Sequence, residues 1–352
     1  MATRSTPKSG SPAGSGFVSG AYDSGSIGTA PSSVTFPTLI QISRPYLSAE
    51  HIAILSQQAN NSNGVRESQS RFHAFALIIN TGNQLRFPVR TLGSAMVLFQ
   101  QFYLFNSLQN FSSVSDTALA CLLVASKMED TLKKIKDILI AAYNVRHPNG
   151  PEISLDSQVL DEQRRRSLFL ERQVLETMSF DFRVKHPHPY VIKFCRKLTL
   201  GSEQAQLAWL ICFDSYKTLA PLKHTAHAIA LASIYIAGVL LDRDISGYAN
   251  NTADFLVDLH DYENIILELL ELYIDWLPQT TLASRFPDLD KFMSMRIEVN
   301  KRLSHSNGSD NQFESKNDIL KAPKIRDFTI GDKGTMRYVL DSERAKVEES
   351  LL

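Results

Sequence analysis

The chain has 352 residues, of which 43% are hydrophobic and 21% are charged, so it has the composition of a folded protein and the length for two domains. Lysine and arginine total 37, as do aspartate and glutamate, and this neutral balance argues against binding to nucleic acid or membranes through overall charge. We expect no signal peptide, because residues 1–31 are rich in serine, glycine and proline without an apolar core, and no apolar run approaches the roughly 18 residues of a membrane span. The cysteines are widely spaced in apolar stretches, which predicts reduced core residues of an intracellular protein: Cys121, Cys195 and Cys212.

The two ends of the chain differ in composition from the middle. Residues 1–35 are rich in serine, glycine and proline and carry too little apolar surface to offset the entropy lost on ordering, so we expect a disordered leader. Within it, Thr6 and Ser11 are each followed by proline and are candidate sites for proline-directed phosphorylation. Residues 287–352 are expected to form a mostly flexible tail, although the stretch DKFMSMRIEVNKRL fits a short helix.

Between these ends, apolar residues recur with helical spacing, and the alternation typical of strands is nearly absent. In the first half, the pattern predicts helices within residues 44–56, 70–82, 90–105, 113–127 and 164–180. Ser48 is placed to cap the first of these helices, and Gly82 is expected to end the second as a C-terminal glycine. The segment from Ala118 to Ala125 is apolar or small at every position, which predicts a central helix surrounded by others.

The central helix has a second copy later in the chain. The stretch ALACLLVASK, residues 118–127, aligns with ALASIYIAGV, residues 230–239, with four identical positions. Each copy follows an aromatic-rich helix and precedes a loop and an amphipathic helix, which in the second copy is ENIILELLELY. Two copies of about 100 residues are too few and too long for a solenoid. They predict an all-α fold of two successive five-helix domains, over residues 36–184 and 185–286.

Two charged residues stand out from this pattern. Lys127 ends the first copy where the second has a valine, so the shared fold does not require a lysine there. Glu171 lies on the apolar stripe of its own predicted helix, with Val174 and Met178 one and two turns further on. Because an unpaired buried carboxylate is costly, we expect Glu171 to meet a donor, and Lys127 at a neighbouring helix end is the candidate.

Two interpretations of this pair remain open. It is either an internal ion pair that closes a helix junction or the centre of a protein interface. The second interpretation draws on the apolar residues expected around the pair, which would be costly to leave exposed on a monomer: Val124, Met128, Phe180 and Phe182. A charged pair ringed by apolar side chains sets the register of an interface, while the rim excludes water.

At these residues the chain resembles the cyclin family, over about residues 40–280. LACLLVASKMEDTLKKIKDIL is similar to the third helix of a cyclin box and LERQVLETMSFDF to the fifth, and Lys127 and Glu171 stand where the family has its lysine and glutamate. The two copies then correspond to the tandem cyclin-box fold. FQQFYLFNSLQNF and FRVKHPHPYVIKF resemble the transcriptional branch, with cyclins K, T and C, and SRPYLS with the leader resembles the cyclin (beta) subunits of fungal carboxy-terminal-domain kinases.

The resemblance implies a regulatory subunit without catalytic residues, cofactor or metal, which binds and activates a nuclear cyclin-dependent kinase. Its target would be the heptad-repeat tail of RNA polymerase II, in support of transcription elongation. Lys127 and Glu171 would hydrogen-bond backbone groups near the C-helix of the kinase. The apolar contact would come from Val124, Met128, Phe180 and Phe182. The identity of the kinase and the need for a third subunit stay open.

Two positions depart from the family pattern. Arg71 matches the substrate-docking arginine of cell-cycle cyclins, but Ser70 and Ala74 stand where larger apolar residues are expected. We therefore do not expect this motif to recruit substrates here. Gln100 and Gln101 replace a charged pair found in many cyclins, which puts one internal polar contact in doubt.

Other functions account for some of the same features. A transcription factor of the IIB type uses the same tandem fold to bind DNA, but phosphate contacts need clustered cations and the charge is balanced. A cyclin of the C or T type, serving a different transcriptional kinase, is the alternative within the family. The histidines show no converging set of zinc ligands, so no metal site is expected: His186, His188, His224 and His227.

Overall fold

The computed structural model describes residues 40–43, 46–59, 64–107, 114–150, 158–243, 245, 252–309 and 335–338. All of them belong to one compact unit, Leu39–Leu352. The predicted leader with Thr6 and Ser11, and most of the predicted tail, lie outside the described residues. In the described part of the chain, no helix has both the length and the apolar character needed to cross a membrane.

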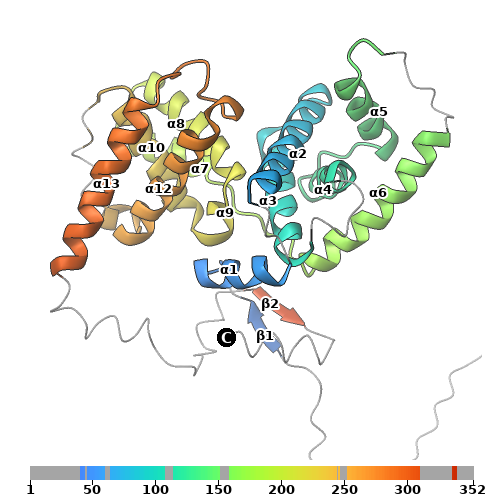
Figure 1. Cartoon of the computed structure of the whole chain (residues 1–352), viewed down its shortest axis with the longest axis horizontal. Coiled ribbons are helices and arrows are strands. Elements are labelled where there is room, and N and C mark those ends of the chain that lie inside the picture. The colour runs from blue at the N-terminus through green and yellow to red at the C-terminus, as the bar shows by residue number, and fades with distance from the viewer. Residues whose placement is uncertain are drawn as a thin grey trace, which may run out of the picture. The chain divides into compact units, whose positions relative to one another are not determined.

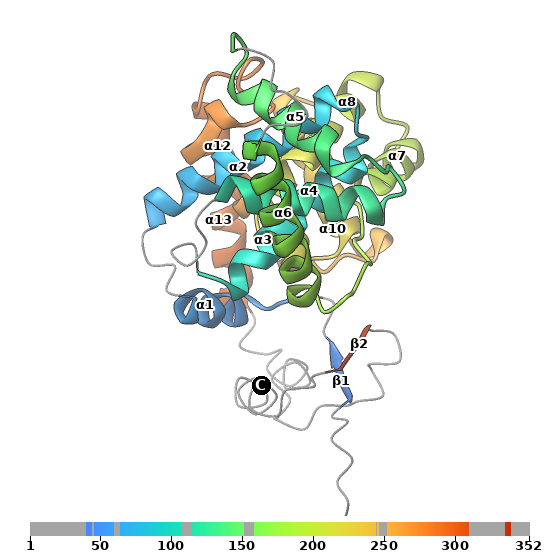
Figure 2. The same ribbon diagram turned by 90° about the vertical axis from the view of Figure 1, so that its right-hand side faces the viewer.

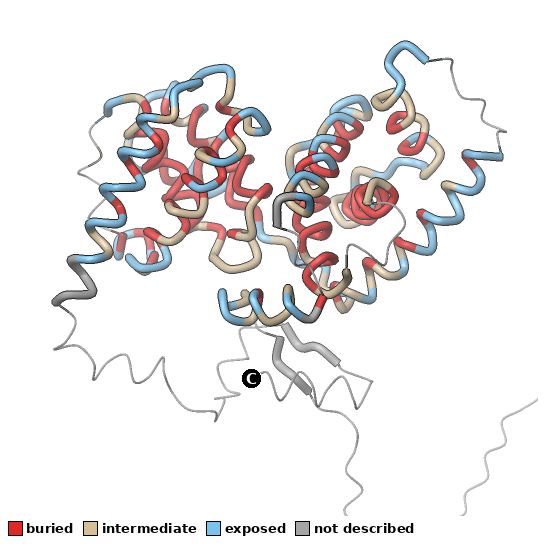
Figure 3. Tube along the Cα trace, viewed as in Figure 1, coloured by how far each residue is buried: buried red, intermediate tan, exposed pale blue. Residues whose placement is uncertain are grey.

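The first helical bundle surrounds α4. Its helices are α1 (Ala49–Gln58), α2 (Gly64–Gln84), α3 (Val89–Phe105), α4 (Val114–Met128), α5 (Ile135–Arg146) and α6 (Gln158–Thr177) (Figures 1 and 2). Helices α2, α3, α5 and α6 all pack against α4, which is buried from Asp116 to Ser126 (Figure 3). The apolar run therefore has no polar face because neighbouring helices cover every side of it.

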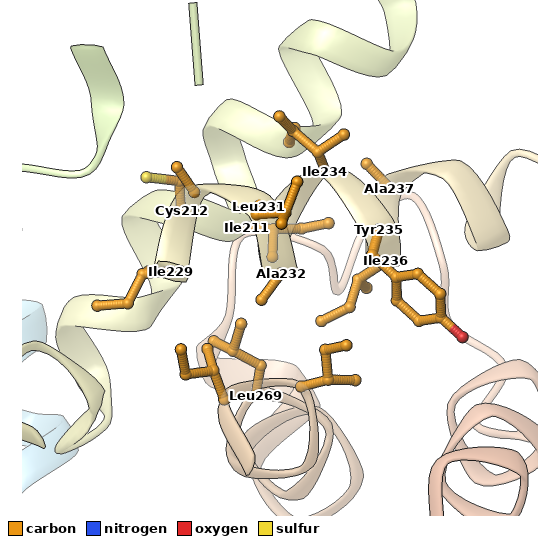
Figure 4. Close-up of a cluster of buried hydrophobic side chains, with 14 of the residues drawn as sticks. Ile211, Cys212, Ile229, Leu231, Ala232, Ile234, Tyr235, Ile236, Ala237 and Leu269 are labelled. Atoms are coloured by element: carbon orange, nitrogen blue, oxygen red, sulfur yellow. The ribbon is translucent and has the colours of Figure 1, made fainter. Parts of the chain in front are cut away.

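The second bundle repeats this plan around α10. Its helices are α7 (His188–Lys197), α8 (Ser202–Asp214), α9 (Ala220–Lys223), α10 (Ala226–Leu240), α12 (Leu259–Trp276) and α13 (Asp290–Ser309), with short 3-10 turns at Ser215–Lys217, Thr252–Phe255 and Leu277–Gln279. Figure 4 shows the isoleucine and alanine side chains of α10 packed against Ile211 of α8 and Leu269 of α12. The predicted all-α class is confirmed, and a short antiparallel pair, β1 (Ile40–Ser43) with β2 (Thr335–Tyr338), adds to it.

The two central helices end in the same way. Asp130 and Asp242, which occupy matching positions of the repeat, both have a φ of 53°. The next amide then reaches back five residues, from Thr131 to the carbonyl of Ser126 at 2.9 Å, and the second copy has the same bond between its matching residues at 2.9 Å. The two copies therefore match even in the hydrogen bonds that end their central helices.

Two sequence expectations about helix ends have different outcomes. Ser48 caps α1 as predicted, since its hydroxyl accepts a bond from the His51 amide at 3.2 Å. Gly82 does not end α2, which continues to Gln84. A Cβ atom at Gly82 would overlap the side chain of Leu92 on α3, so this glycine allows the two helices to approach closely.

Helix α13 corrects the predicted boundary at residue 286. It lies beside α12 and places Phe292, Met295 and Val299 in the core of the second bundle (Figure 1). These residues recur with helical spacing, and burying them stabilises the segment as a helix rather than as a flexible tail. At its start, Lys291 donates to the Leu240 carbonyl at 3.2 Å and to the Asp242 carboxylate at 2.8 Å, at the end of α10.

The bundles meet through Tyr216, a residue of the second half that is buried in the core of the first. Gly93 of α3 makes room for it, because a Cβ atom there would lie 2.5 Å from the tyrosine ring. Gln100 of α3 donates to the backbone carbonyls of Tyr216, at 3.2 Å, and of Thr218. The polar contact that the sequence left in doubt at Gln100 is thus a bond between the two bundles.

Candidate protein-binding site

Lys127 and Glu171 meet where the last turn of α4 passes α6. The Lys127 ammonium donates to Oε1 of Glu171. The glutamate side chain is 12% exposed, whereas that of the lysine is 50% exposed. An ammonium has three N–H groups, and no other acceptor among the described residues is recorded for it. The lysine can therefore offer further donors to an incoming partner, while Glu171 holds it from the more buried side.

Phe180 and Phe182 form an exposed apolar pair just after α6. Their side chains are 58% and 53% exposed, and the ring centroids lie 6.4 Å apart in an edge-to-face arrangement. The chain turns through two consecutive left-handed residues, Ser179 and Phe180, with φ values of 54° and 56°. The Phe180 amide reaches back five residues to the Leu175 carbonyl at 3.1 Å, so α6 ends in the same way as α4 and α10, and the turn projects Phe180 and Phe182 beyond its end.

The other two apolar residues predicted for the site lie deeper. Met128 is half-buried and packs at the edge of the first core cluster. Val124 is only 2% exposed and belongs to that core, so it offers little surface to a partner, unlike the exposed residue that the sequence led us to expect. The reason is the position of α4: one turn before Lys127 the helix is already enclosed by its neighbours.

Sequence reasoning missed two exposed leucines in the same two segments. Leu168 lies one turn before Glu171 on α6 and is 45% exposed, and Leu132 follows α4 and is 69% exposed. The spacing of Leu168 from Glu171 was a readable signal, because residues three apart share a helix face. Leu132 lies in a turn, where no periodicity marks it.

A polar cluster centred on the buried Glu129 joins the segments that follow α4 and α6. Its Oε1 accepts from the Ser94 hydroxyl at 2.7 Å and from Nε2 of His186 at 3.0 Å, and its Oε2 pairs with Arg90 at 2.9 Å. Burial raises the pKa of Glu129, but the bonds from Ser94 and His186 and the charge of Arg90 outweigh it and lower the pKa overall. Glu129 is therefore held as a carboxylate.

His186 links this cluster to the second bundle. Its Nδ1 lies 2.8 Å from the Tyr216 hydroxyl, while Nε2 faces Glu129. Burial lowers the pKa of His186 more than Glu129 raises it, so the neutral ring is favoured. The neutral ring fits both contacts if Nε2 carries the proton and Nδ1 accepts from Tyr216.

Stability should fall in mild acid because of His188, which packs against Tyr216 and Trp209. Burial first, and the nearby His186 second, lower the pKa of His188 from 6.5 to about 4. Because the unfolded chain takes up this proton at higher pH than the folded one, the free energy of unfolding falls as pH drops from 6.5 toward 4. We expect a loss of about 2 kcal/mol from His188 between about pH 7.5 and about pH 5.

Denaturant unfolding at these two pH values measures this loss. His188→Gln removes the titrating ring and should reduce the pH dependence, while His186, whose pKa is also lowered, maintains a smaller change of the same sign. Equal pH dependence in the variant and the parent protein would contradict the assignment to His188.

Other positions singled out in the sequence have partners of their own. Arg71 pairs with Glu67 at 2.6 Å and lies over the ring of Tyr103, so it is held within the first bundle. His224 faces Asp261 at 3.3 Å. Among the residues that the structure describes, no group of three or more His, Cys, Asp or Glu side chains is arranged to hold a metal ion.

Comparison with known proteins places the chain in a family. Residues 41–183 match the model of the cyclin N-terminal domain. The CTD kinase subunit beta of Schizosaccharomyces pombe is 35% identical over 325 residues, covering 87% of this chain and 91% of that protein. The CTD kinase subunit beta of Saccharomyces cerevisiae is 28% identical, covering 90% and 97% of the two chains.

A solved structure has a similar fold. A chain in the crystal structure of the yeast RNA Pol II CTD kinase CTDK-1 complex aligns with a TM-score of 0.65 and 27% identity, over 89% of this chain and all of that one. Both the sequence match and the fold extend through the two bundles, as the resemblance predicted. The chain is therefore a member of the cyclin family and belongs to the group of CTD kinase beta subunits.

Proposed function

We propose that this protein is the regulatory cyclin subunit of a nuclear cyclin-dependent kinase that phosphorylates the C-terminal domain of RNA polymerase II and supports transcription elongation. Its relatives are named as beta subunits of CTD kinases, and the similar solved chain is part of a CTD kinase complex. The observation that carries the proposal is the half-open Lys127–Glu171 pair, bordered by exposed Phe180 and Phe182.

The Lys127–Glu171 pair can form hydrogen bonds with backbone groups at the end of a kinase helix. A lysine ammonium can donate to carbonyl groups left free at a helix end, and the carboxylate can accept from free amides. Glu171 is mostly buried and fixes the direction of Lys127, so less side-chain entropy is lost when a partner binds. Phe180 and Phe182 would supply apolar contact, with Met128 at the edge.

Activation follows from binding one kinase conformation better than another. Holding the C-helix of the kinase inward allows its glutamate to pair with the strand lysine that orients the ATP phosphates. A cyclin that binds only this arrangement shifts the kinase population toward it. The protein would thus promote phosphorylation without performing chemistry itself.

Affinity purification of the full chain from its native cells tests the proposal. We expect a cyclin-dependent kinase to co-purify in amounts comparable with the cyclin, and the complex to phosphorylate a heptad-repeat peptide. The same sample shows whether a third subunit accompanies the pair, and microscopy of a fluorescent fusion tests the nuclear location. Absence of a kinase, together with a salt-dependent DNA mobility shift, would favour the factor IIB alternative instead.

A further inference from the structure

A buried hydrogen bond joins the two segments that border the proposed kinase surface. The first segment begins at Lys127 in the last turn of α4, and the second follows α6 and contains Phe180 and Phe182. Glu129 lies two residues after Lys127, and His186 lies four residues after Phe182. Their side chains meet at 3.0 Å, so this contact fixes one segment against the other.

The second bundle provides the partner that orients His186. The Tyr216 hydroxyl lies 2.8 Å from Nδ1 and can donate to it, which leaves the ring proton on Nε2, facing Glu129. Without that donor, Nδ1 would lose its partner in the core, and the ring would lose the bond that fixes it from the second bundle. Tyr216 thus supports the tautomer that the Glu129 carboxylate also favours, and it holds the ring in place against that carboxylate.

The Tyr216 side chain is fixed by its surroundings in the core. Its side chain is 0% exposed, its ring fills the space that Gly93 leaves open, and its backbone carbonyl accepts from Gln100 at 3.2 Å. On the far side of the contact, Ser94 and Arg90 fix the Glu129 carboxylate. The line from Tyr216 through His186 to Glu129 is therefore rigid at both ends.

We propose that Tyr216 is a positioning residue for kinase binding, which acts through His186 and Glu129 on the segments carrying Lys127 and Phe182. The second bundle would thereby contribute to kinase affinity although Tyr216 is buried away from the proposed surface. This inference rests on the proposed function, since it concerns the same surface.

Tyr216→Phe tests the inference because it removes the hydroxyl and keeps the ring in the core. We expect the affinity for the purified kinase subunit, measured by titration calorimetry, to fall roughly three- to tenfold with unchanged helical content. Glu129→Gln, which keeps the shape and removes the charge, should lower the affinity in the same direction. Hydrogen exchange of the free protein should become faster at the amides of residues 126–131 in both variants.

Tyr273→Phe is the matched control. This variant also removes a fully buried hydroxyl from the second half, but that hydroxyl contacts Asp214 at 3.4 Å rather than His186. We expect its kinase affinity to equal that of the parent protein. A loss as large as that of Tyr216→Phe would show a general effect of destabilising the second bundle and would overturn the inference.

A double variant separates this inference from the proposed function. If Tyr216 acts through the segment of Lys127, Tyr216→Phe should reduce kinase affinity less in the Lys127→Ala variant than in the parent protein. Fully additive losses would overturn the positioning role. If Lys127→Ala weakens binding and Tyr216→Phe does not, the inference fails and the proposed function stands. If Lys127→Ala itself has no effect, the proposed surface is wrong and the inference fails with it.

Discussion

Replacing Lys127 with alanine is expected to weaken binding of the kinase subunit by about thirtyfold, equivalent to about 2 kcal/mol, as for a central interface residue. Kinase activity on a heptad-repeat peptide should fall with it at limiting cyclin. Stability should fall by about 1–2 kcal/mol with the fold retained, because the lysine is half exposed but Glu171, whose side chain is 12% exposed, loses its donor. Calorimetric titration and thermal unfolding of the same samples measure the two effects.

Lys291→Ala is the matched control for this experiment. Lys291 also forms an ion pair between two elements, with Asp242 at 2.8 Å, and its side chain is 48% exposed against 50% for Lys127. It belongs to the second bundle, so its removal should leave kinase affinity unchanged. If Lys127→Ala or Glu171→Ala instead unfolds the first bundle, the pair is an internal ion pair that closes a helix junction.

Asp214→Asn is expected to destabilise the protein by about 3–5 kcal/mol, because it leaves a buried ammonium without its counter-charge. Asp214 is 0% exposed and accepts from Lys217 at 2.7 Å and from the Thr281 amide at 2.9 Å. The Lys217 side chain is 5% exposed, and its only other recorded acceptor among the described residues is the Gln279 carbonyl, at 2.8 Å. Denaturant unfolding at neutral pH measures the loss.

Two further variants provide a control and a rescue for this prediction. Glu203→Gln alters a carboxylate that is half exposed and pairs with Arg285 at 2.6 Å, and it should cost less than about 1 kcal/mol. Adding Lys217→Met to Asp214→Asn removes the isolated charge and should restore part of the stability. A loss from Asp214→Asn no larger than that from Glu203→Gln would show that the buried pair is not a major contribution.

The sequence predicted those features that local patterns encode. The apolar run from Ala118 predicted an enclosed helix, and the carboxylate of Glu171 on an apolar stripe predicted the donor that the structure supplies from Lys127. Both follow from the cost of leaving apolar surface exposed or charge buried. Their role in kinase binding came from the family resemblance and stays a prediction.

Features set by packing between distant segments could not be predicted in this way. Val124 and Met128 are adjacent on one helix face, and only the neighbouring helices decide that the first is enclosed and the second is half open. The sequence marked His186 only as one of four histidines without a metal site, since nothing near it in the chain shows that Glu129 and Tyr216 lie on either side of its ring. Such contacts depend on how the two bundles dock.

Helix α13 has a consequence for stoichiometry. It packs beside α12, the counterpart of α6 in the repeat, and its Lys291 binds Leu240 and Asp242 at the end of α10. These two residues are the counterparts of Met128 and Asp130 at the end of α4. In the second copy, a lysine from the chain's own next helix thus bonds to the end of the central helix, whereas in the first copy Lys127 at the matching end is half exposed. The two copies differ at this end, so we expect one cyclin to bind one kinase, through its first bundle.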